Sequence, residues 1–440
     1  MDLSTATHLR ANPDDYLFGK RQAWFAFVMT VALMLADYID RQVIVSLFPH
    51  LKLEWGLSDK QLGALVSAVS VTVAAGAVPI ALWADRGSRV KSIVVMATAW
   101  SLACISCMFT RNYSQLLIAR AVVGVGEAGY GSVGAALLTS HFPARMRSAL
   151  MGAFFAAGSF GSVLGVMLGG VIAAHWGWRA AFGVVGIPGL ALALLYMFVR
   201  DYRTVALSPR LDQATQSLGS SARAIVAALT RSPSMLWVCL GSSAQVIVLS
   251  TVWAWLPSYL NRTRGLPPEK AAVSAALVVL CGAVGAVLWG AVVDRSGRHR
   301  PRNKLTTVAV LCLLSMAMLM PSLGGTGLAL APGRQLAWIA VGGLLMTCTA
   351  GPAVALVLDV VHPGIRATAG AVLAIFLNLF GLAAGPFIAG VLSDLWTLPV
   401  AMAIMPAFSV LAALGFLVAA RTYERDVQGI REQVAAETVA

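Results

Sequence analysis

Ionisable residues interrupt two apolar stretches of the chain. Asp37, Asp40 and Arg41 lie in one hydrophobic run, and Arg120 and Glu127 lie in another. An ionised side chain near the centre of a bilayer costs at least about 2.5–3.5 kcal/mol even on the scale derived from insertion experiments. Five such residues in two segments are therefore unlike membrane anchors, and they indicate a polar, water-reachable pathway through a bundle of helices.

The spacing of these five residues predicts that they share helix faces. Asp37 lies three residues before Asp40 and four before Arg41, so these side chains are neighbours on a helix. Arg120 and Glu127 are seven residues apart, which is about two helical turns. If the first segment runs outward and the second runs back, their depths pair Asp40 with Arg120 and Asp37 with Glu127. We therefore predict one shared charged site.

In that site three carboxyl groups meet two guanidinium groups, a surplus that suits proton transfer. Burial increases the proton affinity of a carboxyl group, and a nearby arginine decreases it. We expect Asp40 and Glu127, with Asp37 as a third candidate, to take up and release protons. Arg120 would alternate between these acids and an anionic substrate, while Arg41 would hold the network and help to bind that substrate.

The alternative for the same residues is a permanent buried network of ion pairs. Two observations favour the functional interpretation over this structural one. The acids outnumber the arginines, and buried ion pairs stabilise proteins poorly compared with apolar side chains of similar volume.

Composition assigns the chain to the integral membrane proteins. Of its 440 residues, 58% are hydrophobic and 12% are charged, whereas about 25% charged is usual for a soluble domain. Runs of about 20 mostly apolar residues are long enough to span a bilayer as helices. We predict an all-α fold with twelve such spans, at 23–48, 61–84, 90–109, 113–141, 146–174, 178–200, 233–260, 268–293, 304–322, 334–361, 366–393 and 397–421.

An internal repeat divides these spans into two pseudo-symmetric bundles of six helices. Three positions recur 220 residues later, namely Pro143 as Pro363, Gly161 as Gly381 and Gly165 as Gly385. The predicted organisation is an N-terminal bundle over 1–200, a cytoplasmic linker over 201–232, a C-terminal bundle over 233–425 and a cytoplasmic tail over 426–440.

The net charge of +13 follows the predicted loops rather than one basic surface. On the side of the two termini the loops and ends hold 22 Lys and Arg residues, and on the other side they hold 8. An excess of Lys and Arg marks the cytoplasmic face, so both termini are expected in the cytoplasm. The basic composition is thus a signal of topology, and we expect no nucleic-acid partner.

Two loops carry a related motif of an acid followed by arginines. The motif comprises Asp85, Arg86 and Arg89 after the second span, and Asp294, Arg295 and Arg298 after the eighth. An acid at the cytoplasmic end of a span can hold two helices together through the arginines, and such a latch must break when the access state changes. The simpler alternative is that these charges only set the topology.

These features together resemble the major facilitator superfamily over essentially the whole chain, and the two loop motifs resemble its loop signature. The segment Tyr38-Ile39-Asp40-Arg41, together with Arg120, Gly124, Gly126 and Glu127, resembles the Spinster family. This resemblance implies a carrier of lysophospholipids or sphingosine phosphate. Asp37 departs from the asparagine that is common in that family, and it adds a third carboxyl group.

The second half of the chain has few polar residues within its spans. Gln245 and Asn378 are its candidates for substrate binding. Trp253, Trp255 and Tyr259 are interpreted as part of an interfacial aromatic belt, with cavity lining as the alternative. In the first half, Cys104 and Cys107 are expected to pack as small apolar side chains and not to form a redox pair.

An enzyme is disfavoured because the sequence shows no catalytic or metal-ligand spacing. Its six histidines lie near span ends or in loops. We expect a proton-coupled transporter for an amphiphilic anion that works by alternating access, driven by the proton gradient with no cofactor or metal. A carrier of small organic anions or drugs is the alternative within this class, and a channel or a receptor is the alternative outside it. The predicted protein is a monomer that contacts lipids in the bacterial inner membrane.

Overall fold

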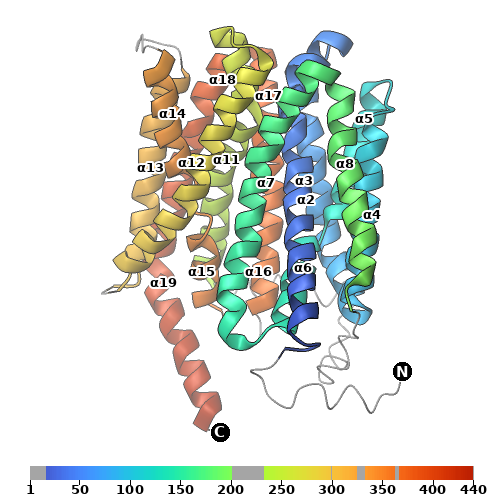
Figure 1. The fold of residues 1–440 in the computed structure, drawn as a ribbon. Helices are drawn as coiled ribbons and strands as arrows, with labels where there is room; N and C mark the ends of the chain where they lie inside the picture. The colour runs from blue at the N-terminus through green and yellow to red at the C-terminus, as the bar shows by residue number, and fades with distance from the viewer. Residues whose placement is uncertain (1–15, 201–231, 299, 325–331, 362–365, 440) are drawn as a thin grey trace. The chain divides into compact units, whose positions relative to one another are not determined.

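The computed structural model describes residues 16–200, 232–298, 300–324, 332–361 and 366–439, and the elements formed by these residues are helices (Figure 1). Eleven helical segments within the described residues are long and apolar enough to cross a membrane. The prediction of an all-α membrane protein is therefore confirmed, and eleven of the twelve expected spans have a counterpart of full length.

The remaining span, predicted at 334–361, is divided into α14 (Pro332–Met346) and α15 (Pro352–Asp359). A turn joins them, and Pro352 follows it at the start of α15, a position where its missing N–H costs nothing. The fourth span is divided at the corresponding place, between α5 (Tyr113–Glu127) and α6 (Tyr130–His141). The two halves of the chain thus repeat this interruption as well as their glycines.

The described helices fall into two compact units. The first unit covers 1–55 and 71–216, and the second covers 56–70 and 217–440. Helix α3 (Asp59–Arg86) contributes its first residues to the second unit and the remainder to the first. The predicted linker lies almost entirely outside the described residues, and the predicted tail begins within α19 (Phe408–Val439).

The first unit is organised around the long helix α2 (Lys20–Trp55), which packs along α7 (Arg147–Trp176). A Cβ atom added at Gly161, Gly165 or Gly169 of α7 would lie 2.6 Å from a backbone carbonyl oxygen of α2. Only glycine permits so close an approach of the two backbones. The other helices of this unit are α4 (Arg89–Cys107), α5, α6 and α8 (Trp178–Leu195).

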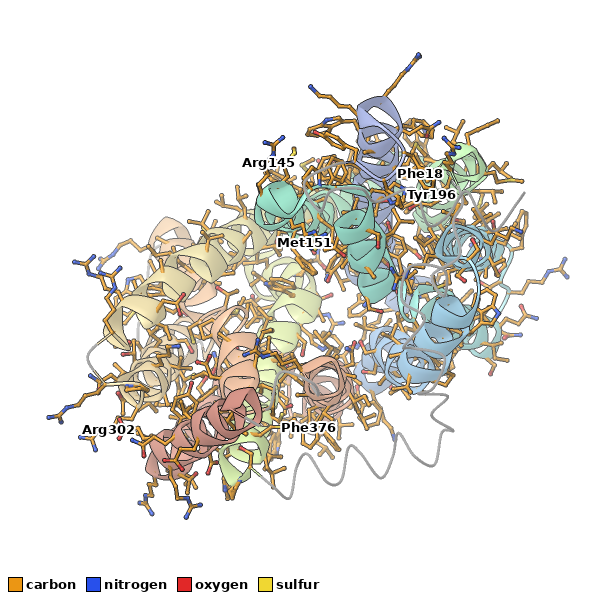
Figure 2. The ribbon with its side chains drawn as sticks, turned by 90° about the horizontal axis from the view of Figure 1, so that it is seen from below. Phe18, Arg145, Met151, Tyr196, Arg302 and Phe376 are labelled. Carbon is orange, nitrogen blue, oxygen red and sulfur yellow. The ribbon has the colours of Figure 1, made fainter. Side chains whose placement is uncertain are left out.

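Figure 2 views the end of the first unit at which Arg145 lies exposed in the short helix η1 (Ala144–Met146). Tyr196, also labelled there, is fully buried, and its hydroxyl lies 2.8 Å from the hydroxyl of Thr30. Tyr130 at the start of α6 donates a hydrogen bond of 2.6 Å to the carbonyl of Thr30. These bonds connect α2 with α6 and with the end of α8.

The second unit is organised around α11 (Pro233–Arg264), which packs against η5 (Leu377–Leu382), α17 (Ala384–Leu395) and α19. A Cβ atom at Gly385 would lie 2.6 Å from the carbonyl oxygen of Ile247, so this glycine acts as Gly165 does in the first unit. The predicted span 366–393 is α16 (Arg366–Phe376), the π-helical turn η5 and α17. The unit also contains α12 (Pro268–Ser296), α13 (Asn303–Leu323), which follows the exposed Arg302 of Figure 2, and α18 (Leu398–Ile404).

The interpretation of Trp255 and Tyr259 as an interfacial belt is wrong. Trp255 is fully buried and donates from Nε1 to the carbonyl of Pro386 at 3.0 Å. Tyr259 is 2% exposed and donates to the carbonyl of Leu323 at 2.9 Å. Both polar tips are satisfied by backbone oxygen atoms within the unit, so neither side chain needs the membrane–water interface.

The start of α3 is held by a polar cluster in the second unit. The Asp394 carboxylate accepts hydrogen bonds from the backbone N–H groups of Asp59 and Lys60, both at 2.8 Å. Arg262 donates to the Asp59 carboxylate through both terminal nitrogens, at 2.7 and 2.9 Å. Ser393 contributes a further hydrogen bond to Asp59. The N-terminus of α3 is thereby fixed to both α11 and α17.

Candidate functional site

The five ionisable residues predicted to share a site come together in the first unit, from α2 and α5. Asp37, Asp40, Arg120 and Glu127 are at most 3% exposed. The side chain of Arg41 is 20% exposed and is the most accessible of the five. Burial of this many charged groups is expected only where they compensate one another.

Asp40 and Arg120 form one buried ion pair of the cluster. Arg120 Nη1 lies 3.4 Å from Asp40 Oδ1, and it also donates to the backbone carbonyl of Asp40 at 3.4 Å. The pairing predicted from the depths of the two residues is confirmed. Since Arg120 is 1% exposed, its charge is compensated by Asp40 and not by solvent.

Arg41 links the other two acids. Its Nε lies 3.3 Å from Asp37 Oδ1, one turn away on α2, and 3.0 Å from Glu127 Oε2 on α5. Arg41 therefore lies against two carboxyl groups, while Arg120 is paired with one. With all five groups ionised the cluster carries a formal charge of −1, which is unfavourable in a site removed from water.

The end of α5 places Glu127 in a distinctive electrostatic position. Glu127 is the last residue of the helix, Ala128 is extended, and Gly129 has a φ of +90° at the start of α6. The C-terminus of a helix carries a partial negative charge, so an ionised carboxylate there is disfavoured unless a cation compensates it. Arg41 supplies that compensation. Of the sequence features, only Gly129 marks this break, because glycine adopts positive φ without strain.

One residue of the site was missed from the sequence. Cys104 of α4 was expected only to pack, but its Sγ lies 3.0 Å from Asp40 Oδ1 and 3.4 Å from the backbone carbonyl of Phe182 on α8. Its thiol is 1% exposed. Cysteine is a common buried residue in apolar helices, so nothing in the sequence distinguishes Cys104 from the other five cysteines.

The two candidates for substrate binding in the second half lie in the second unit. Gln245 of α11 is fully buried and donates to Ser315 Oγ at 3.1 Å and to the carbonyl of Met346 at 3.2 Å, at the end of α14. Asn378 is half-buried in η5 and donates to the carbonyl of Ala374 at 2.9 Å. Its own carbonyl accepts from Ala383. Such π-helical turns are frequent at functional sites.

The loop motifs are only partly described. The side chains of Asp85 and Arg86 lie outside the described part of the structure. Arg89 donates to the carbonyl of Ala136 and to Ser140 Oγ, at 3.3 and 3.2 Å. Asp294, Arg295 and Arg298 are exposed, and Asp294 has no ion pair within the described residues. The proposed latch stays a prediction.

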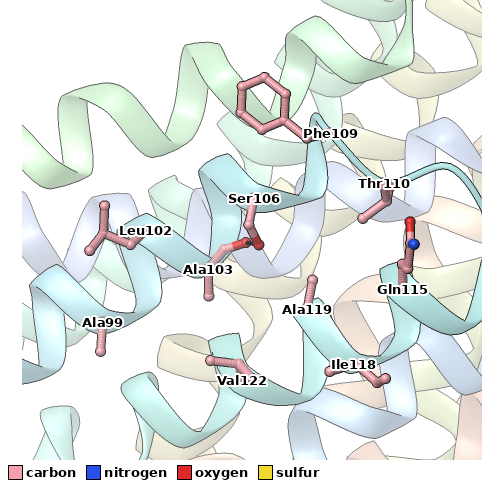
Figure 3. Close-up of a pocket in the computed structure, with 10 residues that line it drawn as sticks. All are labelled: Ala99, Leu102, Ala103, Ser106, Phe109, Thr110, Gln115, Ile118, Ala119 and Val122. Atoms are coloured by element: carbon pink, nitrogen blue, oxygen red, sulfur yellow. Dashed lines mark hydrogen bonds between the residues drawn. The ribbon is translucent and has the colours of Figure 1, made fainter.

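A groove with a volume of about 630 Å³ lies between α4 and α5 (Figure 3). Its wall is largely apolar, and the polar side chains that line it are Ser106, Thr110 and Gln115. It is separate from the charged cluster, because none of the five ionisable residues lines it. Among the described residues, no three His, Cys, Asp or Glu side chains are grouped so that they could hold a metal ion.

Two relatives are similar to this chain in sequence. A gallate transporter of Pseudomonas putida is 29% identical over 322 residues, which is 67% of this chain and 71% of the relative. The human protein spinster homolog 1 is 28% identical over 383 residues, which is 82% of this chain and 71% of the relative.

A solved structure and a family model are also similar to this chain. The crystal structure of a bacterial homolog of the human lysosomal transporter Spinster has a TM-score of 0.82 at 20% identity, and the match covers 93% of this chain and 99% of that one. The family model of the Major Facilitator Superfamily matches residues 30–379. This match covers more than half of the chain, includes the charged residues of α2 and α5 and extends into the second unit. The chain therefore belongs to the major facilitator superfamily of membrane transporters.

Proposed function

We propose that the protein is a proton-coupled secondary transporter that moves an amphiphilic anion, of the lysophospholipid or sphingolipid type, by alternating access. The charge imbalance of the buried cluster is the observation that carries this proposal. Three carboxyl groups surround two guanidinium groups, and one bound proton makes the cluster neutral. Because a buried net charge is costly, a proton or a charged ligand is needed to balance the site.

Asp40 and Glu127 are the proposed proton-binding groups, and Asp37 is the third acid of the network. When a substrate anion approaches Arg120, it competes with Asp40 for the same guanidinium group. Loss of the arginine makes the ionised form of Asp40 less favourable, so binding of the anion promotes binding of a proton. This exchange couples the two events without any cofactor.

An amphiphilic substrate is what the resemblance of the segments around Asp40 and Arg120 to the Spinster family implies, and the chain is similar to the human spinster homolog 1 over 82% of its length. The two arginines suit an anionic head group, since a guanidinium group can bind phosphate or carboxylate through two parallel hydrogen bonds. Within the described part of the second unit, charged side chains lie near helix ends or in the part of α19 from Arg421 onward. Gln245 and Asn378 are the proposed polar contacts in this unit. A largely apolar surface suits an acyl chain.

A small organic anion is the second candidate substrate. It is favoured by the similarity to a gallate transporter, at 29% identity over 67% of the chain. The same arginines and acids serve this function, because the anionic group is the part of the substrate that they recognise. The two candidates therefore differ in the apolar part of the substrate and not in the coupling chemistry.

The remaining features complete the proposal. The loop motifs at Asp85, Arg86 and Arg89 and at Asp294, Arg295 and Arg298 are proposed to stabilise one access state. The protein is proposed to act as a monomer in the bacterial inner membrane, in contact with its lipids, with both termini in the cytoplasm. Multiple membrane-crossing helices and the superfamily assignment support the membrane location.

Flux into vesicles containing the purified protein tests the proposal. Transport of a fluorescent lysophospholipid and of gallate should be measured with and without a pH gradient. The variants are Asp40→Asn and Glu127→Gln, which imitate the protonated acids. Glu54→Gln is the matched control, because Glu54 lies on α2 in an exposed pair with Arg179.

The expected result is saturable flux of one substrate class that the pH gradient accelerates in wild type and in Glu54→Gln. Asp40→Asn and Glu127→Gln should lose that acceleration, because a neutral side chain has no proton to exchange. Wild-type coupling in both variants would exclude these acids as the coupling groups. Flux of gallate alone would select the small anion as the substrate.

A further inference from the structure

We propose that Cys104 is a positioning residue for Asp40, and that its thiol directs the coupling proton to one oxygen of that carboxyl group, Oδ2. The inference deepens the proposed function, on which its role in transport rests. The geometric part, a thiol that changes its hydrogen-bond partner when Asp40 binds a proton, can be tested without any transport measurement.

The two oxygens of Asp40 differ in their surroundings. Oδ1 lies 3.0 Å from Cys104 Sγ and 3.4 Å from Arg120 Nη1, so both donors approach the same atom. Oδ2 is buried and accepts no hydrogen bond from the described residues. A proton on Oδ1 would have to take the position of one of the two donors, whereas no donor occupies Oδ2. The proton is therefore directed to Oδ2.

The Cys104 thiol has a second possible acceptor besides Asp40, the backbone carbonyl of Phe182. Cys104 Sγ lies 3.4 Å from the carbonyl oxygen of Phe182, and a thiol has a single hydrogen to donate. An ionised carboxylate is the stronger acceptor, so the hydrogen lies toward Asp40 when that group is charged. When Oδ2 is protonated, Oδ1 becomes an ordinary carbonyl oxygen, and the Phe182 carbonyl can compete for the thiol.

A substitution at Cys104 leaves the other titratable and charged residues around Asp40 in the sequence. They are Arg120 and Glu127 from α5, Cys107 from α4, and Asp37 and Arg41 from α2 itself. A change in the proton binding of Asp40 in a Cys104 variant can therefore be assigned to the lost thiol when a matched variant of a neighbouring residue leaves it unaffected.

Cys107 provides that matched control. It lies one turn after Cys104 on α4 and is equally buried, but its thiol is directed to the carbonyl of Ala103 in its own helix, at 3.4 Å. Cys107→Ala removes the same group from the same helix without removing a donor to Asp40. Cys104→Ser keeps a donor at the site, whereas Cys104→Ala removes it.

The first measurement is pH-difference infrared spectroscopy of the purified full-length protein. It follows the S–H stretching band, which lies in a spectral region free of other protein bands. In wild type and Cys107→Ala, one S–H band should shift as the Asp40 carboxyl band titrates. That band should be absent from Cys104→Ala, and in Asp40→Asn its position should no longer depend on pH. If the Cys104 S–H band has the same position in wild type and Asp40→Asn at every pH, the proposal is overturned.

The second measurement is the pH midpoint of the Asp40 carboxyl band. A hydrogen bond to a charged group lost in Cys104→Ala makes the carboxylate less favourable, so the midpoint should rise by about one pH unit. It should stay at or below the wild-type value in Cys104→Ser and at the wild-type value in Cys107→Ala. Equal midpoints in all four proteins also overturn the proposal.

These readouts separate the two hypotheses. If the infrared bands behave as expected but vesicle flux does not respond to a pH gradient, the role of Cys104 toward Asp40 stands and the proton-coupled function fails. If flux responds to the gradient but the S–H band is independent of Asp40, the function stands and the positioning role fails.

Discussion

Arg120 and Arg41 differ in how they can meet a ligand. Arg120 is 1% exposed and paired with Asp40, whereas the Arg41 side chain is 20% exposed and lies between Asp37 and Glu127. An approaching anion therefore meets Arg41 first. Arg120 becomes available only when Asp40 releases it, which is the step that the proposed mechanism links to a proton.

At this scale we predict that Arg120→Ala destabilises the protein strongly, because it leaves the buried Asp40 carboxylate without its cation. Removal of one partner of a buried ion pair costs about 3–5 kcal/mol. The double variant Arg120→Ala/Asp40→Asn should recover part of the loss, since the uncompensated charge is gone. Thermal unfolding in detergent measures both effects.

The exposed pair of Arg179 and Glu54 is the control for this prediction. Its two side chains are 41% and 42% exposed at a separation of 2.7 Å, and such pairs contribute about 0–1 kcal/mol. Arg179→Ala should change the melting temperature little. A similar small change for Arg120→Ala would mean that Asp40 does not depend on Arg120 for compensation.

At the scale of elements, the position of α2 depends on α7. Backbone contact between the two helices at Gly161, Gly165 and Gly169 determines the rotation of α2, and this rotation directs Asp37 and Asp40 away from α7 toward α4 and α5. The glycines of α7 thus support the charged site although they contain no functional group themselves.

We predict that Gly165→Ala destabilises the protein and weakens transport. The added Cβ would lie 2.6 Å from the carbonyl oxygen of Ile39 and 2.9 Å from Gln42 Cβ. Overpacking of this kind costs about 1–3 kcal/mol. Gly152→Ala is the control in the same helix, since nothing lies within 4 Å of its added Cβ.

Because alanine is the better helix former by about 1 kcal/mol, Gly152→Ala should leave the melting temperature unchanged or raised. Fluorescence-detected size exclusion after heating compares the two variants. Equal melting temperatures would show that α2 can move away from α7 at little cost.

Helix α3 has both a local and a tertiary N-terminal cap. Ser58 and Gln61 bond reciprocally, with Gln61 Oε1 accepting from Ser58 N at 2.9 Å and Ser58 Oγ from Gln61 N at 3.2 Å. This is the capping box that the sequence Ser-x-x-Gln specifies. The carboxylate of Asp394 on α17 accepts hydrogen bonds from the N–H groups of Asp59 and Lys60, the two residues between Ser58 and Gln61 in the chain.

We predict that Asp394→Ala destabilises the packing of α3 on α17 by about 1–2 kcal/mol, as for the loss of an N-cap acceptor. Asp394→Asn should cost less, because it keeps one acceptor oxygen. Hydrogen exchange of the first turn of α3 reports the effect directly, and it should accelerate in Asp394→Ala. Unchanged exchange there would show that Ser58 and Gln61 suffice.

At the scale of the whole molecule, the distribution of basic residues predicts the orientation in the membrane. The described cysteines give little background for thiol labelling, since five of the six are buried and Cys281 is partly so. A cysteine introduced at Ser217 should therefore be protected from a membrane-impermeant reagent in intact cells and react after permeabilisation. Labelling in intact cells would place the predicted linker outside and reverse the topology.

The sequence by itself determined the class, the helices and the membership of the charged site. Hydrophobic runs specify spans because the bilayer leaves a helix few alternatives. Ionised residues inside such runs must find one another, so the pairing of Asp40 with Arg120 followed from their depth alone. The repeat of Gly161 and Gly165 as Gly381 and Gly385 predicted two corresponding halves, and in both halves these glycines lie at close helix contacts.

Only the tertiary structure decided which donors surround each carboxyl oxygen. Cys104, Trp255 and Tyr259 were misassigned because their roles depend on acceptors 64 to 131 residues away in the chain. The structure also revealed features that the sequence analysis did not predict, namely the breaks in the fourth and tenth spans and the π-helical turn η5. A hydropathy pattern reports how apolar a segment is, but hydrogen-bond partners are set by the rotation and depth at which neighbouring helices pack.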